Sequence, residues 1–436
     1  MSEQTSTPTT APGVSPAHEI QLRAVTVVDR KAPTMFAILT IGLALIVGFG
    51  SQEGDTSFRL AVPTDFFELP TVTVPSTATT WLLVLVCAAL AAYSFFLLTR
   101  KQNTRLWLVV LFALAWMTGF LAWAGADATL PVVGLLAGSL AVAVPLVFGA
   151  MGGVLGERSG VVNIAIDGQL LFGAFAAAMI GSLTGSTWAG LGAAMVAGLL
   201  VAAVLGVFAI SYMVDQVIVG VVLNVLIIGI TSFMFSQVLA PNAATLNHPP
   251  RFERWAIPVL GDIPLVGPIF FRQTPIVYLL YIAVALVTWA LYRTKWGLRV
   301  RAVGEHPKAA DTVGIKVNRT RFRTILLGGA IAGMGGAFYT LVSVPQFNRE
   351  MTGGAGYIAL AAVIFGKWDP IRATLAALLF GFASNLQGVL SVIGSPVPSQ
   401  FMLMLPYVVT IFAVAGLVGR SRAPAADGIP YRTDNH

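Results

Sequence analysis

Residues 131–152 read PVVGLLAGSLAVAVPLVFGAMG, a run of apolar and small residues without a single charged side chain. A helix needs about 20 mostly apolar residues to cross a membrane, because each residue adds about 1.5 Å against a hydrocarbon core of about 30 Å. This run is long enough to do so. Segments of the same apolar character lie at 34–50, 80–99, 106–125, 161–181, 188–210, 217–240, 276–292, 322–345, 354–366, 372–393 and 401–418.

The composition of the whole chain supports the same class of protein. Of its 436 residues, 56% are hydrophobic and only 10% are charged, whereas a soluble globular domain has about 25% charged residues. Intrinsic disorder needs low hydrophobicity and high net charge, so it is excluded as well. The sequence therefore predicts an all-α polytopic membrane protein with about twelve transmembrane segments. The short segment 354–366 is a candidate half-helix, and the polar segment 161–181 is a candidate broken helix.

Some function classes are excluded by the residues that the chain lacks. Its single cysteine, Cys87, rules out a disulfide framework, and its four histidines are too scattered to form a metal cluster. The formal net charge of +7 could indicate nucleic-acid binding. The basic residues instead fall in the turns between apolar segments, so we expect contact with membrane lipid and no nucleic-acid partner.

The charged residues also predict the orientation. Cytoplasmic loops of membrane proteins are enriched in Lys and Arg. The connection 293–321 has two acidic residues and eight basic ones, which are Arg293, Lys295, Arg299, Arg301, Lys308, Lys316, Arg319 and Arg321. The turn 100–105 and both chain ends are also basic, whereas the loop 51–79 has four acidic residues and one basic residue. Twelve crossings with cytoplasmic N- and C-termini satisfy all of these assignments.

The composition changes along the chain and suggests four parts. Residues 1–31 are rich in Ser, Thr and Pro and are predicted to be a disordered polar tail. Residues 32–130 carry three generic spans and form an accessory membrane region. Residues 131–419, where glycine is dense and polar residues enter the apolar runs, form the working core, with the connection 293–321 inside it. Residues 420–436 form a short polar tail.

Two glycine-rich stretches of the core, 149–175 and 353–370, combine clustered Gly with a few polar residues. Glycine lets helices approach closely and lets the backbone turn within the membrane. Short segments interrupted by Gly or Pro, at corresponding places in two halves of a chain, are typical of a transport pathway. Whether these two stretches form an internal repeat is left open by the sequence.

Polar side chains within the apolar segments of the core are the candidates for pathway lining or pathway support. An ionisable group in a span costs several kcal/mol and usually has a role, so Asp167 is the leading candidate. The alternative is a structural cap, in which Asp167 accepts from backbone N–H groups at a helix start. Each amide could instead be hydrogen-bonding glue between helices. The full set is Asn163, Asp167, Gln169, Asn224, Tyr357, Asn385 and Gln387.

The basic connection carries its own helix signals. Pro307 suits the first turn of a helix and Gly314 suits its end, which predicts one short helix between them. Ala309, Ala310 and Val313 are expected on one side of this helix, where they could enter a groove of a partner protein. The alternative is a solvated basic loop next to anionic lipid.

Three motifs make the chain resemble a known family. They are GERSGVVNIAIDG at 156–168, GEHPKAA at 304–310, and GYIALA at 356–361 followed by GKWDP at 366–370. Together they resemble permease subunits of ABC importers in the branched-chain amino acid/simple-sugar permease superfamily, and most of all the nucleoside-importer permeases. The resemblance covers about 131–418. Related permeases usually carry Glu where this chain has Asp167, which keeps the charge but shortens its reach and weakens the case for a direct role.

The resemblance implies a function and a set of partners. An extracytoplasmic binding lipoprotein would deliver a nucleoside to two permease chains in the cell membrane, and two ATPase subunits would drive alternating access. The 156–168 motif resembles one of two paired permeases, so a heterodimer is expected. No catalytic residue, metal or cofactor is expected on this chain, and ATP and Mg²⁺ would bind the ATPase. The residues implied to couple to the ATPase are Gly304, Glu305, Pro307, Lys308, Ala309, Ala310 and Gly314.

Three other classes of function are compared with what the residues can support. The fragment Gly366-Lys367-Trp368 lacks the glycine spacing and the hydroxyl of a phosphate-binding loop, so ATP hydrolysis is expected on another chain. An ion-coupled secondary transporter would need intramembrane carboxylates, for which Asp167 is the one clear candidate. A membrane-embedded enzyme would need a partner for that acid, and none is identifiable. An ABC permease for a simple sugar also remains open.

Overall fold

A computed structural model describes residues 30–50, 52–62, 67, 69–395, 400–401, 404 and 422–432. Nearly all of the predicted span 401–418 and of the predicted tail 1–31 lies outside the described residues. The long helices are α1 (Lys31–Phe49), α2 (Ser76–Thr99), α3 (Leu106–Ala124), α4 (Val132–Arg158), α5 (Ile166–Thr184), α6 (Thr187–Gly206), α7 (Gln216–Met234), α9 (Pro275–Arg293), α12 (Val317–Phe338) and α14 (Pro370–Val392).

The remaining elements are short. Four are α-helices, namely α8 (Ala243–Leu246), α10 (Lys295–Glu305), α11 (Pro307–Thr312) and α13 (Ala355–Phe365). Four further segments are π-helical, namely η1 (Val207–Ser211), η2 (Phe235–Leu239), η3 (Gly267–Phe271) and η4 (Tyr339–Ser343). The strands are β1 (Asp55–Arg59), β2 (Val72–Pro75), β3 (Thr129–Pro131), β4 (Trp255–Ala256) and β5 (Arg272–Gln273).

The predicted all-α polytopic architecture is confirmed. Among the described residues, ten helices are long and apolar enough to cross a membrane. The predicted half-helix 354–366 is α13, whose 11 residues are too few to span alone. The polar segment 161–181 is not broken in its middle. It is the continuous helix α5 from Ile166 onward, preceded by a loop that contains Asn163.

The core is built on close helix crossings that only glycine permits. A side-chain carbon on Gly152 of α4 would lie 2.5 Å from the carbonyl oxygen of Gly328 in α12. One on Gly173 of α5 would lie 2.5 Å from the carbonyl oxygen of Gly333, also in α12. Small residues at crossings let the backbones of membrane helices come together. The glycine density beyond residue 131 therefore reflects the packing of α12 against α4, α5 and α6.

Gly198→Ala should show how much this packing contributes. A methyl group there would overlap the carbonyl oxygen of Gly329, whereas one on Gly192 of the same helix meets open space. Overpacking of this kind costs about 1–3 kcal/mol. We expect Gly198→Ala to lower the thermal unfolding temperature of the purified chain in detergent. Gly192→Ala should leave it unchanged, and equal temperatures for the two variants would contradict the packing argument.

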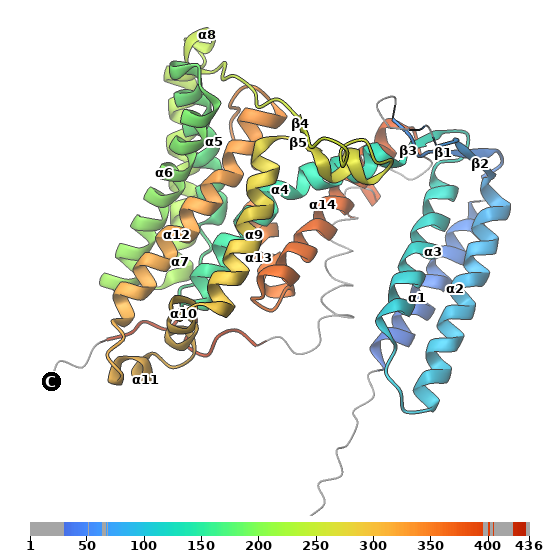
Figure 1. The fold of residues 1–436 in the computed structure, drawn as a ribbon, viewed down its shortest axis with the longest axis horizontal. Helices are drawn as coiled ribbons and strands as arrows, with labels where there is room; N and C mark the ends of the chain where they lie inside the picture. Colours follow the sequence, from blue (N-terminus) through green and yellow to red (C-terminus); the bar gives the residue numbers. More distant parts are fainter. Residues whose placement is uncertain are drawn as a thin grey trace, which may run out of the picture.

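Helices α1–α3 form a bundle of their own beside the core (Figure 1). Above this bundle, β1 pairs antiparallel with β2 and parallel with β3, and β3 leads directly into α4. Leu43 of α1 and Trp123 of α3 share an apolar cluster with Leu386 and Leu390 of α14. The accessory region therefore touches the core through the sheet and through the last turns of α14.

The basic turns lie at one end of the molecule. Figure 1 shows the start of α1, the turn between α2 and α3, and the α10–α11 connection at the same end, while the β1–β3 sheet and α8 lie at the other. This arrangement agrees with the predicted sorting of basic and acidic connections to opposite sides. The assignment of the basic end to the cytoplasm stays a prediction.

Candidate functional site

The candidate site begins where the chain turns back after α4. Helix α4 ends at Arg158, and Gly160 in the following loop has a φ of +88°, a conformation that favours glycine. Ile166, the first residue of α5, packs against Gly149 and Gly153 of α4. Gly153 lies five residues, or about 8 Å, before the end of α4. The start of α5, which is level with Gly153, therefore lies about 8 Å deeper in the core than the end of α4. The N-terminus of α5 is therefore buried within the helical core.

Asp167 caps a neighbouring helix. Its Oδ1 accepts from the backbone N–H of Gly356 at 2.9 Å, and its Oδ2 accepts from the hydroxyl of Thr352 at 3.4 Å. Gly356 lies in the first turn of α13, where backbone N–H groups have no partner within the helix. The side chain is only 4% exposed. Asp167 therefore does act as a cap, but for α13 rather than for the helix that contains it.

Asn224 of α7 does the same for α5. Its Oδ1 accepts from the N–H of Gly168 in the first turn of α5 at 2.8 Å. Its Nδ2 donates to the carbonyl of Ile164 at 2.9 Å and to the Tyr357 hydroxyl at 3.1 Å. Two buried helix N-termini, those of α5 and α13, are thus each capped by a side chain from another helix. The positive ends of their dipoles face polar oxygens in the interior.

Asn163 and Gln169 pair with each other. The Asn163 Nδ2 donates to the Gln169 Oε1 at 3.1 Å, and the Gln169 Nε2 donates to the Asn163 Oδ1 at 3.3 Å. Both side chains are fully buried. The pair fastens the α4–α5 loop to the first turn of α5, which is the role of polar glue rather than of a group free to bind a ligand.

Five of the seven predicted pathway residues therefore come together, and two do not. Asn385 of α14 donates to the carbonyl of Leu135 at 2.8 Å and to the Ser139 hydroxyl at 3.3 Å. Leu135 precedes Gly153 by 18 residues, a separation of about 27 Å along α4. Gln387 is a half-buried residue of α14, two positions further on. In the five-residue cluster, Tyr357 is the outward member, with 46% of its surface exposed.

The far end of α13 is held by residues that the sequence analysis did not assign to the site. Buried Glu157 accepts a hydrogen bond from the indole N–H of Trp368. Arg158 donates from Nε to the carbonyl of Trp368 at 2.8 Å. Glu157 and Arg158 thus bind the end of α13 separately. The 156–168 motif holds the 356–370 motif at both ends, a pairing that the shared pattern of Gly and polar residues could have suggested.

This arrangement is suited to positioning helices. The Asp167 carboxylate and the amides of the cluster are engaged with backbone groups or with each other. Within the described residues, no group of three His, Cys, Asp or Glu side chains is placed to hold a metal. The geometry supports α13 as a short buried helix whose place is fixed by polar contacts at its two ends.

Replacements of Asp167 test the capping role. Asp167→Ala would leave the Gly356 N–H buried without a partner, which costs about 1–3 kcal/mol. Asp167→Asn keeps an oxygen that can accept this bond. We expect the Ala variant to unfold at a lower temperature in detergent, with the Asn variant close to the parent chain. If Asn were as damaging as Ala, the charge itself and not the cap would be the requirement.

The 293–321 connection contains two helices rather than the predicted one. Helix α11 begins at Pro307 as predicted, and Gly314 follows it with a φ of +81°. The added helix, α10, packs so closely against the end of α4 that a methyl group on Gly304 would overlap the carbonyl of Arg158. Glu305, at the end of α10, accepts from the backbone N–H of Ala425 at 3.2 Å.

One expectation about α11 is wrong. Ala310 does not share an outward side with Ala309, because it is only 4% exposed and packs against Val303, Val317 and Tyr431. The outward side of the α11 region carries Lys308, Ala309, Val313 and Gly314, all of which are exposed. Adjacent residues of an α-helix point about 100° apart, because one turn has 3.6 residues. Since Ala310 is packed inward, Ala309 points outward.

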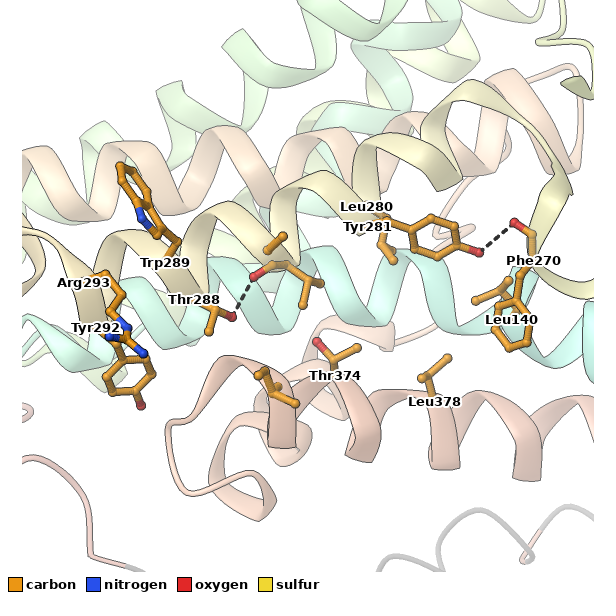
Figure 2. Close-up of a pocket in the computed structure, with 13 residues that line it drawn as sticks. Leu140, Phe270, Leu280, Tyr281, Thr288, Trp289, Tyr292, Arg293, Thr374 and Leu378 are labelled. Atoms are coloured by element: carbon orange, nitrogen blue, oxygen red, sulfur yellow. Dashed lines mark hydrogen bonds between the residues drawn. The ribbon is translucent and has the colours of Figure 1, made fainter. Parts of the chain in front are cut away.

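A groove of about 520 Å³ lies apart from this cluster, between α9 and α14 (Figure 2). Its lining is largely apolar and includes Leu280, Trp289 and Leu378. The hydroxyls in it are already bonded, for example Thr288 to the carbonyl of Val284 at 2.7 Å. A polar solute would find few unoccupied partners there, so this groove is not a candidate substrate site within the single chain.

Comparisons with known proteins identify the family. The model of the branched-chain amino acid transport system permease component matches residues 135–414, more than half of the chain. The guanosine ABC transporter permease protein NupQ of Bacillus subtilis is 42% identical over 306 residues, covering 67% of this chain and 94% of that protein. The nucleoside ABC transporter permease protein NupC of Lactococcus lactis is 37% identical over 312 residues, covering 68% and 96%.

A more distant relative has a different substrate in its name. A Haloferax volcanii protein named as a glucose ABC transporter permease is 34% identical over 312 residues, covering 66% of this chain and 93% of that protein. No solved structure matches the chain. The family match, the extent of the two nucleoside-permease relatives and the membrane-spanning fold all agree. The chain therefore belongs to the ABC transporter permeases of the branched-chain amino acid transport system family.

Proposed function

We propose that this chain forms part of the translocation pathway of an ATP-driven importer for a nucleoside. The main support is the sequence similarity to NupQ and NupC, which extends over nearly the full length of both relatives. The family match over residues 135–414 begins in the first turn of α4 and includes the capped helix starts of α5 and α13. The chain is then a multi-pass protein of the cell membrane, either an inner or a plasma membrane.

The partners follow from the class of transporter. Membership of an ABC permease family implies an ATPase subunit and a substrate-binding protein. ATP and Mg²⁺ would bind the ATPase, and this chain would bind no cofactor. We place the binding protein on the outer face as a lipoprotein. A second, different permease would complete the pathway, because the 156–168 motif of this chain resembles one of two paired permeases.

The docking side for the ATPase is the outward side of α11. Lys308, Ala309 and Val313 are exposed there and combine a positive charge with small and apolar surface. A short helix of this kind can enter a groove of a partner protein. The inner side of α11 rests on α10 and α12, so force on the helix would reach the ends of the spans.

The pathway itself would pass the exposed face of α13. Tyr357 is half exposed, and its hydroxyl accepts from the buried amide of Asn224. A phenol beside an apolar surface can stack on a nucleobase while its hydroxyl keeps a polar partner. Asp167 would support this face by fixing the start of α13. The second permease would supply the opposite wall.

Two alternatives differ in their support. Glucose or another simple sugar is the second candidate, because the Haloferax relative named for glucose is 34% identical. An ion-coupled secondary transporter has less support. Asp167, the carboxylate that such a mechanism would use, is engaged with the Gly356 N–H and the Thr352 hydroxyl and serves as a cap.

Affinity purification of the tagged full-length chain in mild detergent tests the proposed class. The expected result is recovery of an ATPase and of a second, different permease with the chain. Recovery of two copies of this chain with the ATPase would replace the heterodimer by a homodimer. Failure to recover any ATPase, with the chain folded and abundant, would contradict the ATP-driven mechanism.

A further inference from the structure

The C-terminal segment 422–432, here called the strap, folds back onto the α10–α11 end of the molecule. In Figure 1 it is the dark red trace that crosses beside α10 and α11. The sequence suggested a polar tail for this part of the chain. The strap instead places Ala426 and Tyr431 among the buried residues of the protein. Its contacts reach three parts of the fold, namely α10–α11, the start of α12 and the α4–α5 loop.

The backbone of the strap is held by hydrogen bonds. The N–H of Ala426 donates to the carbonyl of Gly304 in α10 at 2.9 Å. Arg321 of α12 donates from Nη1 to the carbonyl of Ile429 at 2.8 Å and from Nη2 to that of Ala426 at 3.3 Å. Arg321 is 1% exposed, so its charge is buried under the strap. Such bonds from a charged donor are about twice as strong as neutral ones.

The strap itself carries a partly buried ionisable group, Asp427. Burial raises the pKa of the Asp427 carboxyl to about 7, against the opposing effects of the Arg321 charge and the Gly428 N–H. The Arg321 guanidinium also lies close to Gly160, where an added methyl group would be 2.6 Å from its Nη2. The strap and Arg321 therefore reach the α4–α5 loop, which leads to Asp167.

Tyr431 connects the strap to α11. Its hydroxyl donates to the Asp311 carboxylate at 2.8 Å, and its ring packs in a cluster with Val303, Ala310 and Val317. Helix α11 has only six residues, and isolated helices below about 12 residues are marginal in water. Its inward side is therefore closed by a residue that lies more than a hundred positions further along the chain.

We propose that the strap is a positioning element of the coupling apparatus, which holds α11 in a fixed register against α10, α12 and the α4–α5 loop. This inference rests on the proposed function, in which α11 receives the ATPase. Movement of α11 is passed to the loop that anchors α5 and, through Asp167, the start of α13. Tyr431 and Arg321 act through other residues and have no contact with the transported solute.

The test compares Tyr431→Ala with Ile429→Ala in the full complex reconstituted in lipid vesicles. Ile429 is exposed on the same segment, and its replacement leaves its backbone carbonyl in place. Three quantities are measured: ATPase recovered with the chain, ATP hydrolysed, and nucleoside taken up. We expect Tyr431→Ala to keep the ATPase bound but to lower uptake per ATP by about tenfold. Ile429→Ala should match the parent chain, and Tyr431→Phe, which keeps the packing, should recover most of the loss.

The possible results distinguish failure of the strap inference from failure of the proposed function. A parent chain that recovers no ATPase overturns both. A parent chain that does so, with Tyr431→Ala giving normal uptake per ATP, overturns the strap inference alone. Loss of ATPase from Ile429→Ala also overturns it, because the strap would then be a docking surface. If Tyr431→Ala is not recovered folded, Arg321→Lys, which keeps the charge but cannot bond both strap carbonyls, replaces it in the same comparison, and normal uptake per ATP in that variant again contradicts the inference.

Discussion

Ala309→Arg is expected to abolish ATP-driven uptake while the chain still inserts and folds. Ala309 lies on the exposed side of α11, so a long charged side chain can be accommodated without disturbing the chain itself. Beside Lys308 it would add bulk and a second positive charge to the surface that we propose docks on the ATPase. Disruption at the centre of such an interface costs 2 kcal/mol or more. We expect ATPase recovery with the tagged chain to fall by at least about thirtyfold.

One variant serves as the control for this prediction. Ala244→Arg makes the same change on exposed α8, at the opposite end of the molecule, and should leave ATPase recovery unchanged. Ala310→Arg is not a clean test, because Ala310 is buried and the variant would disrupt the chain's own packing. Normal ATPase recovery and uptake by Ala309→Arg would show that α11 is not the docking helix.

Gly356→Ala should have the second large effect. A methyl group there would overlap the backbone nitrogen and Cα of Asp167 and lie 2.6 Å from its Cβ. Backbone atoms of a buried helix start cannot move aside, so α13 would have to shift and lose its cap. Overpacking and an unpaired N–H together cost about 2–6 kcal/mol. We expect the variant to unfold at a much lower temperature in detergent and to show no uptake.

Gly388→Ala is the matched control, because its added methyl group meets no atom within 4 Å. It should retain the unfolding temperature and the uptake of the parent chain. A Gly356→Ala variant with parental stability and uptake would mean that α13 does not need its close approach to Asp167. The role assigned to the capped helix start would then be lost.

Much of the fold could be predicted from the sequence because hydropathy is a local property. Each described long helix corresponds to a predicted apolar segment, and α13 was expected to be too short to span. The packing partners were not predictable in this way. Gly152 and Gly328 meet across 176 positions of the chain, and nothing local to either residue specifies the other.

The candidate site was predictable in its residue types but not in its pairings. Asp167 was expected either to line a pathway or to cap a helix, and the choice depended on Gly356, which is 189 positions away. Asn163 and Gln169 satisfy each other, whereas the distant Asn385 fastens α14 to α4. An amide in an apolar segment indicates that a partner exists, but only the fold determines which one.

The 293–321 connection and the strap show a further limit of sequence reasoning. Helix punctuation at Pro307 and Gly314 correctly predicted α11. The orientation of Ala310 depended on Tyr431, which lies beyond the last predicted span and belongs to a segment with a polar composition. A short helix has no strong pattern of its own, so the segment that packs against it decides which side faces outward.

Uptake of radiolabelled guanosine would show whether this chain takes part in ATP-driven nucleoside import. Cells that lack this chain would be compared with cells that carry it, or its Ala309→Arg variant, together with the partner ATPase. We expect ATP-dependent accumulation only with the parent chain, and competition by unlabelled nucleosides but not by glucose. Accumulation that is equal in the absence of the chain, or that glucose but no nucleoside displaces, would contradict it.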